Sequence, residues 1–251
     1  MSLSGRVDRD AAVTEAAAEG WRQAVAEYLT HDDRVVVPIG STEQHGYLSL
    51  GTDAILAERV AVEAAEPLGV PVLPVLPFGS APYFTAFPGS LNLRLSTLLS
   101  VVGDLLDTLV GQGFRRFVIV NGHGGNMPVT GLATEWLAKP REYRVQVKFT
   151  SWYAGAEVSK VAAGYEEDPT HGGWFENFPW TRLADVSLPR EAKPHLSSDV
   201  IGMATAADMR ELTGDGSFGG SYQLSDEAMD HIWRTGVAEV RDLLENGWAF
   251  R

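Results

Sequence analysis

The segment FVIVNGHGGN, residues 117–126, joins four successive apolar residues directly to a glycine-rich polar turn. A short apolar run of this kind is typical of a strand buried on both faces of a parallel sheet. In open α/β sheets, ligands bind just beyond the carboxyl ends of the strands. The segment therefore predicts a buried strand that ends at a ligand-binding edge, with His123 at the centre of the turn.

Apolar runs alternate with helical patterns on both sides of this segment, which indicates a parallel sheet flanked by helices. Further strands are predicted at 35–39, 70–76 and 145–149. Four helices are predicted to begin at a capping residue or a proline, namely at Thr52 or Asp53, at Ser96, at Pro128 and at Ser225. Because no repeat or linker divides the chain, the expected fold is a single-domain α/β three-layer sandwich over residues 1–251, with a mostly parallel sheet.

The composition restricts the partners of this chain. Its 251 residues carry 20 Lys and Arg against 33 Asp and Glu, a net charge of −13 that repels nucleic-acid phosphates and anionic membranes. We therefore expect a neutral or cationic small-molecule substrate. The absence of cysteine excludes disulfides, thiolate metal sites and a cysteine nucleophile. No stretch resembles a signal peptide or a transmembrane helix, so a cytoplasmic location is expected.

Two further polar segments follow the first predicted strand: GSTEQHG, residues 40–46, and GTD, residues 51–53. Glu43 and His45 are two residues apart, so in a near-extended segment both side chains leave the same side of the backbone. Carboxylate and imidazole ligands without thiolates suit Zn, Mn or Fe in a catalytic role. Together with Asp53 and His123, these two residues are candidate metal ligands.

Two of these candidates have a second interpretation. Asp is a preferred helix N-cap, so Asp53 could serve only to begin the helix that follows it. The turn around His123 could instead hold a pyrophosphate at a helix N-terminus, as in dinucleotide-binding proteins. That motif requires glycine where Met127 stands, which favours the ligand role for His123. Asn121 and Asn126 are expected to hold the turn through hydrogen bonds to the backbone.

These segments together resemble the creatininase (creatinine amidohydrolase) family, whose members carry an EQHG…TD segment, an NGHGGN-like turn and a later His-x-x-x-x-Glu segment. The resemblance spans residues 35–178. It implies two divalent metal ions, Zn or Mn in preference to Fe, bridged by Asp53. The ligands that it implies are Glu43, His45, Asp53, His123 and Glu176.

The resemblance also assigns catalysis to His171, beside the metal centre, together with Glu176. From the residues alone, both would be interpreted as surface loop residues. Family members are often hexamers, so the long loop at 77–92 is expected at a subunit interface of a homo-oligomer. The aromatic residues near this segment could line a substrate pocket or pack the loop onto the domain; they are Trp152, Tyr153, Trp174, Phe175, Phe178 and Trp180.

Several positions depart from the family pattern. A second histidine that many members have shortly after His45 is missing, and Phe84 replaces a histidine common before the FPG turn. Trp174 and Gly125 stand where acidic residues are common, which argues against creatinine itself as the substrate. The resemblance thus implies a metal-dependent hydrolase of a C–N bond in a small, preferably cyclic amide. A lactonase or processing peptidase of the same fold, and a non-catalytic nucleotide-binding protein, are the alternatives.

Overall fold

The computed structural model describes residues 23–165 and 168–250. Its strands and helices follow one another in the order β1 (Arg34–Ile39), α2 (Thr52–Ala65), α3 (Leu95–Gln112), β2 (Arg116–Asn121), α4 (Val129–Leu137), β3 (Gln146–Ser151), α5 (Ala156–Ala162), α6 (Ser198–Met203), α7 (Ala206–Thr213) and α8 (Asp226–Asn246).

The three strands form one parallel sheet in the order β1, β2, β3. The apolar run of β2, from Phe117 to Val120, is completely buried, as expected for a central strand that has a neighbour on each side. Ile39 pairs with Asn121, and Asn121 pairs with Ser151, so the carboxyl ends of all three strands meet at one edge. The predicted strands at 35–39, 117–120 and 145–149 are therefore confirmed.

The predicted strand at 70–76 is wrong as a continuous strand. This segment lies beside β1 but pairs with it only through isolated parallel bridges, Val36 with Val72 and Ile39 with Leu76. Pro71 and Pro74 cannot donate a backbone hydrogen bond, which interrupts the ladder. The segment extends the sheet by a partly paired chain rather than by a full strand.

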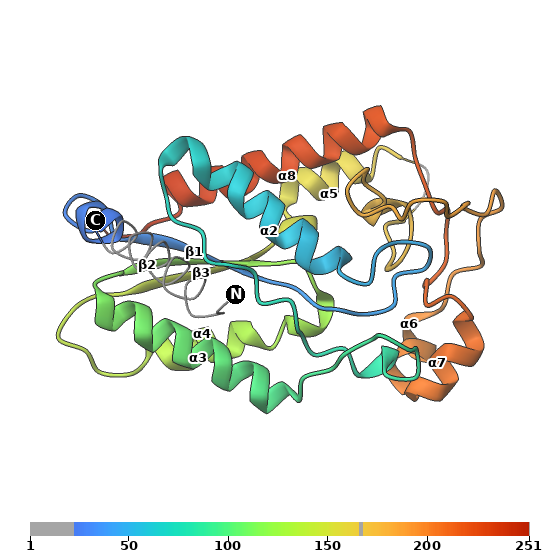
Figure 1. The fold of residues 1–251 in the computed structure, drawn as a ribbon, viewed down its shortest axis with the longest axis horizontal. Coiled ribbons are helices and arrows are strands. Elements are labelled where there is room, and N and C mark those ends of the chain that lie inside the picture. Colours follow the sequence, from blue (N-terminus) through green and yellow to red (C-terminus); the bar gives the residue numbers. More distant parts are fainter. Residues whose placement is uncertain (1–22, 166–167, 251) are drawn as a thin grey trace, which may run out of the picture.

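Helices cover both faces of the sheet, as Figure 1 shows: α2, α5 and α8 lie on one side, and α3 and α4 lie on the other. Two apolar cores fill the spaces between these layers. Trp136 of α4 is 1% exposed and packs in the core beneath α3 and α4. This arrangement confirms the predicted three-layer α/β sandwich with a parallel sheet.

The structure corrects two of the predicted helix starts. Helix α3 begins at Leu95 after Arg94, and Ser96 does not cap it. Helix α2 begins after Gly51 without a side-chain cap, because the hydroxyl of Thr52 donates to the Ser49 carbonyl and Asp53 points elsewhere. The predicted cap of α8 is confirmed: the Ser225 hydroxyl accepts a hydrogen bond from the backbone N–H of Ala228.

Three of the helices named above have no counterpart among the predicted elements. They are α5, α6 and α7, of seven, six and eight residues, which is too short to display a clear helical period. Figure 1 places α6 and α7 beyond the carboxyl edge of the sheet. Among the described residues, no helix has the length and apolar content needed to span a bilayer.

Candidate metal centre

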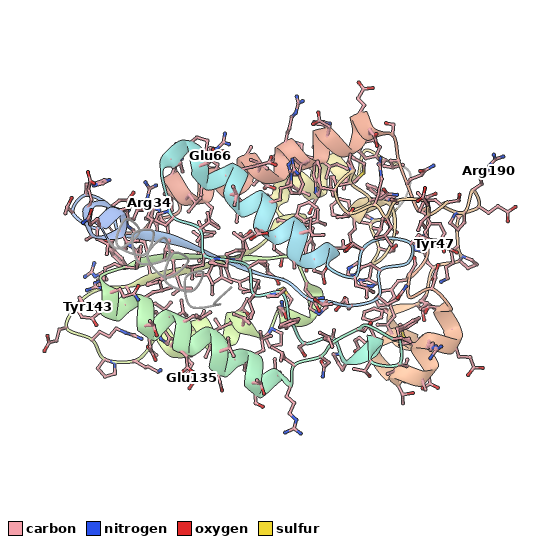
Figure 2. All side chains as sticks on the ribbon, in the orientation of Figure 1. Arg34, Tyr47, Glu66, Glu135, Tyr143 and Arg190 are labelled. Atoms are coloured by element: carbon pink, nitrogen blue, oxygen red, sulfur yellow. The ribbon has the colours of Figure 1, made fainter. Side chains whose placement is uncertain are left out.

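The candidate ligands gather at the carboxyl edge of the sheet, where β1 and β2 end. Tyr47, on the segment after β1, lies in Figure 2 at the end of the molecule opposite Arg34, the first residue of β1. The start of α2 approaches both strand ends closely: a Cβ atom on Gly122 would lie 2.2 Å from the Asp53 carbonyl oxygen, and one on Gly40 would lie 2.5 Å from the Ala54 nitrogen. Glycine at these two positions therefore allows Asp53 to reach the site.

A first group of potential ligands consists of Glu43, Asp53 and His123, all buried. The Nδ1 atom of His123 lies 3.2 Å from Glu43 Oε1 and 3.0 Å from Asp53 Oδ2. One imidazole nitrogen and two carboxylate oxygens thus converge on the same small region.

A second group consists of His45, Asp53 and Glu176. His45 Nε2 lies 3.0 Å from Asp53 Oδ1 and 3.8 Å from Glu176 Oε2. Asp53 therefore directs one carboxylate oxygen to each group, which is the arrangement expected of a bridging ligand. Its side chain does not cap α2, so the structure excludes the alternative in which it serves only as an N-cap.

The donor set fits divalent cations. Glu43 Oε1 and Asp53 Oδ2 are buried and, as long as neutral His123 carries its proton on Nε2, accept no hydrogen bond from the described residues. A buried carboxylate oxygen without a partner is costly, typically by about 1–3 kcal/mol or more for a charged group. Oxygen and imidazole donors around such orphaned oxygens suit Zn or Mn.

Neighbouring groups orient both histidines and Glu43. His45 Nδ1 donates to the Glu43 carbonyl at 3.0 Å and His123 Nε2 donates to the Ser80 carbonyl at 2.9 Å, so the other ring nitrogen of each histidine faces the centre. Ser41 donates to Glu43 Oε2 at 2.8 Å. These contacts preset the histidine tautomers that metal ligation requires.

The two asparagines hold the turn, as predicted. Asn121 Nδ2 donates to the His123 carbonyl at 2.7 Å, and its Oδ1 accepts from the His123 backbone N–H at 3.1 Å. Asn126 Nδ2 donates to the Gly40 carbonyl at 3.0 Å and thereby connects the turn to the end of β1.

The ionisation of these groups follows from their mutual charges. Burial by itself lowers the pKa of His45, but the charges of Asp53 and Glu176 outweigh it and raise the pKa to about 10. Glu43 and Asp53 likewise outweigh burial and raise the pKa of His123. Burial raises the pKa of Glu176 to about 7. In the absence of a cation, protons on the imidazoles balance the buried carboxylates.

His171 forms a third ligand-capable group with Glu43 and His45, but its ring is held differently from those of His45 and His123. Its Nε2 atom donates to the Gln44 carbonyl at 2.8 Å, and its Nδ1 atom lies 3.6 Å from Glu43 Oε1. The rings of Phe84 and Phe218 contact it, with centroids 4.5 and 4.9 Å away. Burial, assisted by the charge of His45, lowers the pKa of His171 to about 4. At neutral pH it therefore has an unprotonated Nδ1 that can accept a proton.

A cavity of about 480 Å³ opens above these residues. Its walls include the aromatic side chains of Tyr83, Phe84, Tyr153, Phe175 and Phe218, and the described lining contains no lysine or arginine. No sequence pattern identifies Phe218 as a residue of the site. The orienting carbonyls of Gln44 and Ser80 could not be predicted either, because every residue carries a backbone carbonyl.

The aromatic residues singled out in the sequence divide between cavity and core. Phe175 and Tyr153 line the cavity. Trp152, Trp174 and Phe178 are at most 2% exposed and pack with α8 in the apolar core. Trp180 packs against Arg59, whose guanidinium carbon lies 3.8 Å from the centre of its ring. Packing is therefore the role of most of these aromatic residues.

The family model named Creatininase, described as creatinine amidohydrolase, matches residues 18–244. The creatinine amidohydrolase of Pseudomonas putida is 32% identical over 173 residues, which cover 62% of this chain and 66% of that protein. The mycofactocin precursor peptide peptidase of Mycolicibacterium smegmatis is 36% identical over 153 residues, which cover 57% of this chain and 54% of that protein. The matched part spans about half to just under two thirds of these relatives.

Solved structures of creatininase share the fold. A Mn form has a TM-score of 0.75 and 23% identity over 92% of this chain and 96% of that chain. A Zn–Zn form of a mutant creatininase has a TM-score of 0.70 and 22% identity over the same shares of the two chains, 92% and 96%.

Proposed function

Because the chain belongs to the creatininase family, we propose that it is a metal-dependent hydrolase that cleaves a C–N bond of a small, preferably cyclic amide. The observation that carries this proposal is the pair of carboxylate–imidazole groups that share Asp53 beneath an aromatic cavity. The family resemblance and the orphaned carboxylate oxygens support the same conclusion.

Two divalent ions would be held by the two groups. Glu43, Asp53 and His123 would hold one ion, and His45, Asp53 and Glu176 would hold the other. Zn or Mn is favoured, since creatininase structures exist in Mn and Zn–Zn forms, with Fe as a third option. The chemistry that such ions supply is the activation of water and the polarisation of a carbonyl group.

His171 would move the proton in this reaction. Its neutral Nδ1 faces the site, so it can accept a proton from the attacking water and return it to the leaving nitrogen. Phe84 and Phe218 exclude water from the imidazole and keep it neutral before the reaction. Glu176, whose carboxylate accepts a hydrogen bond from the Gly172 N–H at 2.7 Å, would be fixed next to the same site.

The cavity walls suggest what the substrate is like. Because the described lining contains no lysine or arginine, the cavity offers no basic side chain outside the ion-binding groups to pair with an anionic substituent, which favours a neutral or cationic substrate. Burial raises the pKa of Tyr153 to about 12, so its hydroxyl stays protonated and can donate a hydrogen bond into the cavity. A planar amide could contact the aromatic walls while Tyr153 binds one of its polar atoms.

A metal analysis joined to a substrate panel tests this function. Protein purified without chelator and reconstituted with Zn or Mn should hold close to two equivalents and hydrolyse at least one of a series of lactams and cyclic amides. Chelation should abolish that activity, and added metal should restore it. Less than about one equivalent after reconstitution, or activity on lactones alone, would overturn the amide proposal.

A processing peptidase is the second candidate, favoured by the 36% identity to a peptide peptidase. Short peptides in the same panel would reveal it. The nucleotide-binding alternative is less compatible with the site, because Glu43 and Asp53 next to His123 would repel a pyrophosphate.

We further propose that residues 1–251 form one hydrolase domain and that the protein is a cytoplasmic homo-oligomer, hexameric by family resemblance.

A further inference from the structure

The loop at residues 213–218, here called the backing loop, contacts His171 and helps to hold it in place. The backbone N–H of Phe218 donates to the His171 carbonyl at 3.0 Å, and the Phe218 ring lies against the imidazole. The Asp215 carbonyl accepts a hydrogen bond from Gln44 Nε2 at 2.8 Å. Because the Gln44 carbonyl in turn accepts from His171 Nε2, the backing loop reaches His171 by two routes.

A single partly buried lysine closes the backing loop. Lys193 Nζ donates to the Thr213 carbonyl and to Asp215 Oδ1, both at 2.5 Å, and to the Ser217 carbonyl at 3.1 Å. These three acceptors use all three hydrogens of the ammonium group. The Lys193 and Asp215 side chains are each only 19% exposed. The ammonium group thus connects the first residue of the loop with Asp215 and Ser217.

Asp215 is fixed from further directions. Its Oδ1 atom also accepts from the Ser217 backbone N–H at 3.0 Å, and its Oδ2 atom accepts from the Tyr222 hydroxyl at 2.6 Å. These contacts hold the Asp215 carboxylate, while the backbone carbonyl of the same residue accepts from Gln44.

The backing loop approaches Gln44 closely at Gly216. Gly216 has φ +88°, and a Cβ atom there would lie 2.5 Å from Gln44 Cγ and 3.3 Å from the Gln44 carbonyl oxygen. A displacement of the loop would therefore be transmitted to the carbonyl that binds His171.

We propose that Lys193 and Asp215 are positioning residues for His171. Their ion pair closes the backing loop, and the loop holds Gln44 and Phe218 in place. His171 therefore keeps its proton on Nε2 and its Nδ1 atom toward Glu43. Neither residue lines the cavity, so they act on His171 only through the backing loop and Gln44. The inference rests on the proposed role of His171 as the proton carrier.

Kinetics of Lys193→Met test the proposal, because methionine keeps most of the length of lysine and removes its charge. In the zinc-loaded enzyme, kcat should fall by about 10- to 100-fold, the effect of a small misplacement of a catalytic group, while KM and the zinc content stay within about twofold. The matched control is Lys139→Met, since Lys139 pairs with Asp107 at 3.7 Å on an exposed surface. The control should retain the wild-type kcat.

A second measurement does not depend on activity. Nitrogen NMR of zinc-loaded protein with labelled histidine reports which ring nitrogen carries the proton, and His171→Asn assigns the signal. The wild type and Lys139→Met should show one Nε2–H tautomer at His171, whereas Lys193→Met should show a mixture. Gly216→Ala should reproduce both effects with the lysine intact, which guards against a Lys193→Met protein that fails to fold.

A wild-type kcat together with an unchanged tautomer in Lys193→Met or Gly216→Ala would overturn the inference. Loss of both zinc and activity in the two variants would also overturn it, because the loop would then position the proposed metal ligands rather than His171. If the wild-type protein hydrolyses no amide, lactone or peptide, the proposed function fails, while the tautomer measurement still decides the positioning role.

Discussion

At the scale of single residues, Asp53 decides what the site can do. Asp53 Oδ1 faces His45 and Asp53 Oδ2 faces His123 at the same distance, 3.0 Å. It belongs to both groups that are proposed to hold an ion, so it would join them into one site. Its sequence context, at the start of a helical pattern, is equally compatible with a simple helix cap. The choice between the two roles depends on where the histidines lie in space.

Replacement of Asp53 by Asn keeps the shape of the side chain and removes its charge. We expect Asp53→Asn to bind less than one equivalent of metal and to lose activity by more than about 100-fold, the upper range for an outer-shell partner. Asp104→Asn, on the exposed side of α3, is the matched control. Full metal content in Asp53→Asn would show that the carboxylate does not bridge the two groups.

The two histidines at 123 and 171 should behave differently when replaced by Ala. His123→Ala removes a donor of the first group, so metal and activity should decline together. His171→Ala should retain metal but lose activity by about 10²- to 10⁴-fold, the range for general acid–base catalysis. Metal analysis of the purified variants, next to their turnover rates, separates the two cases, and equal activity of His171→Ala and wild type would remove His171 from catalysis.

At the scale of secondary-structure elements, the close approach of α2 to the ends of β1 and β2 builds the site. This approach needs a residue without a Cβ atom at Gly122. Two elements could not be predicted correctly from sequence patterns. Segment 70–76 has the apolar content of a strand but is interrupted by prolines, and α7, which leads into the backing loop, is too short to show a period.

Gly122→Ala should separate α2 from the sheet edge. The added methyl group would lie 2.2 Å from the Asp53 carbonyl oxygen, so we expect a loss of about 1–3 kcal/mol in the free energy of unfolding and reduced metal content. The matched control is Gly103→Ala in α3, where nothing lies within 4 Å of the new Cβ atom. That change should stabilise the helix by about 0.5–1 kcal/mol. Thermal unfolding and metal analysis of both variants provide the comparison.

At the scale of the whole molecule, the buried charges couple stability to pH and to metal. The pKa of His45 is raised to about 10 in the folded protein without metal, from about 6.5 in an unfolded chain. A raised pKa contributes stability that is complete below the unfolded value and is lost as the pH rises through the folded value. The metal-free protein should therefore become less stable between about pH 6.5 and pH 10.

Thermal unfolding of chelated and zinc-loaded protein over this pH range tests the coupling. The Tm of the chelated protein should fall steadily as the pH rises. The zinc-loaded protein should keep its Tm, because the ligands are already deprotonated in that form. If the Tm of the two forms changed with pH in the same way, the imidazoles would not exchange protons for metal.

The sequence alone determined the residue types of the site and the class of fold. The alternation of apolar runs and helical patterns is local, and so is the spacing of Glu43, His45 and Asp53, which makes both visible without coordinates. Only the tertiary structure decided that Asp53 faces both groups, that Phe218 contacts His171, and that the carbonyls of Gln44 and Ser80 set the tautomers. The reason is physical: backbone carbonyls are common to all residues, and contacts between distant segments depend on how the layers pack.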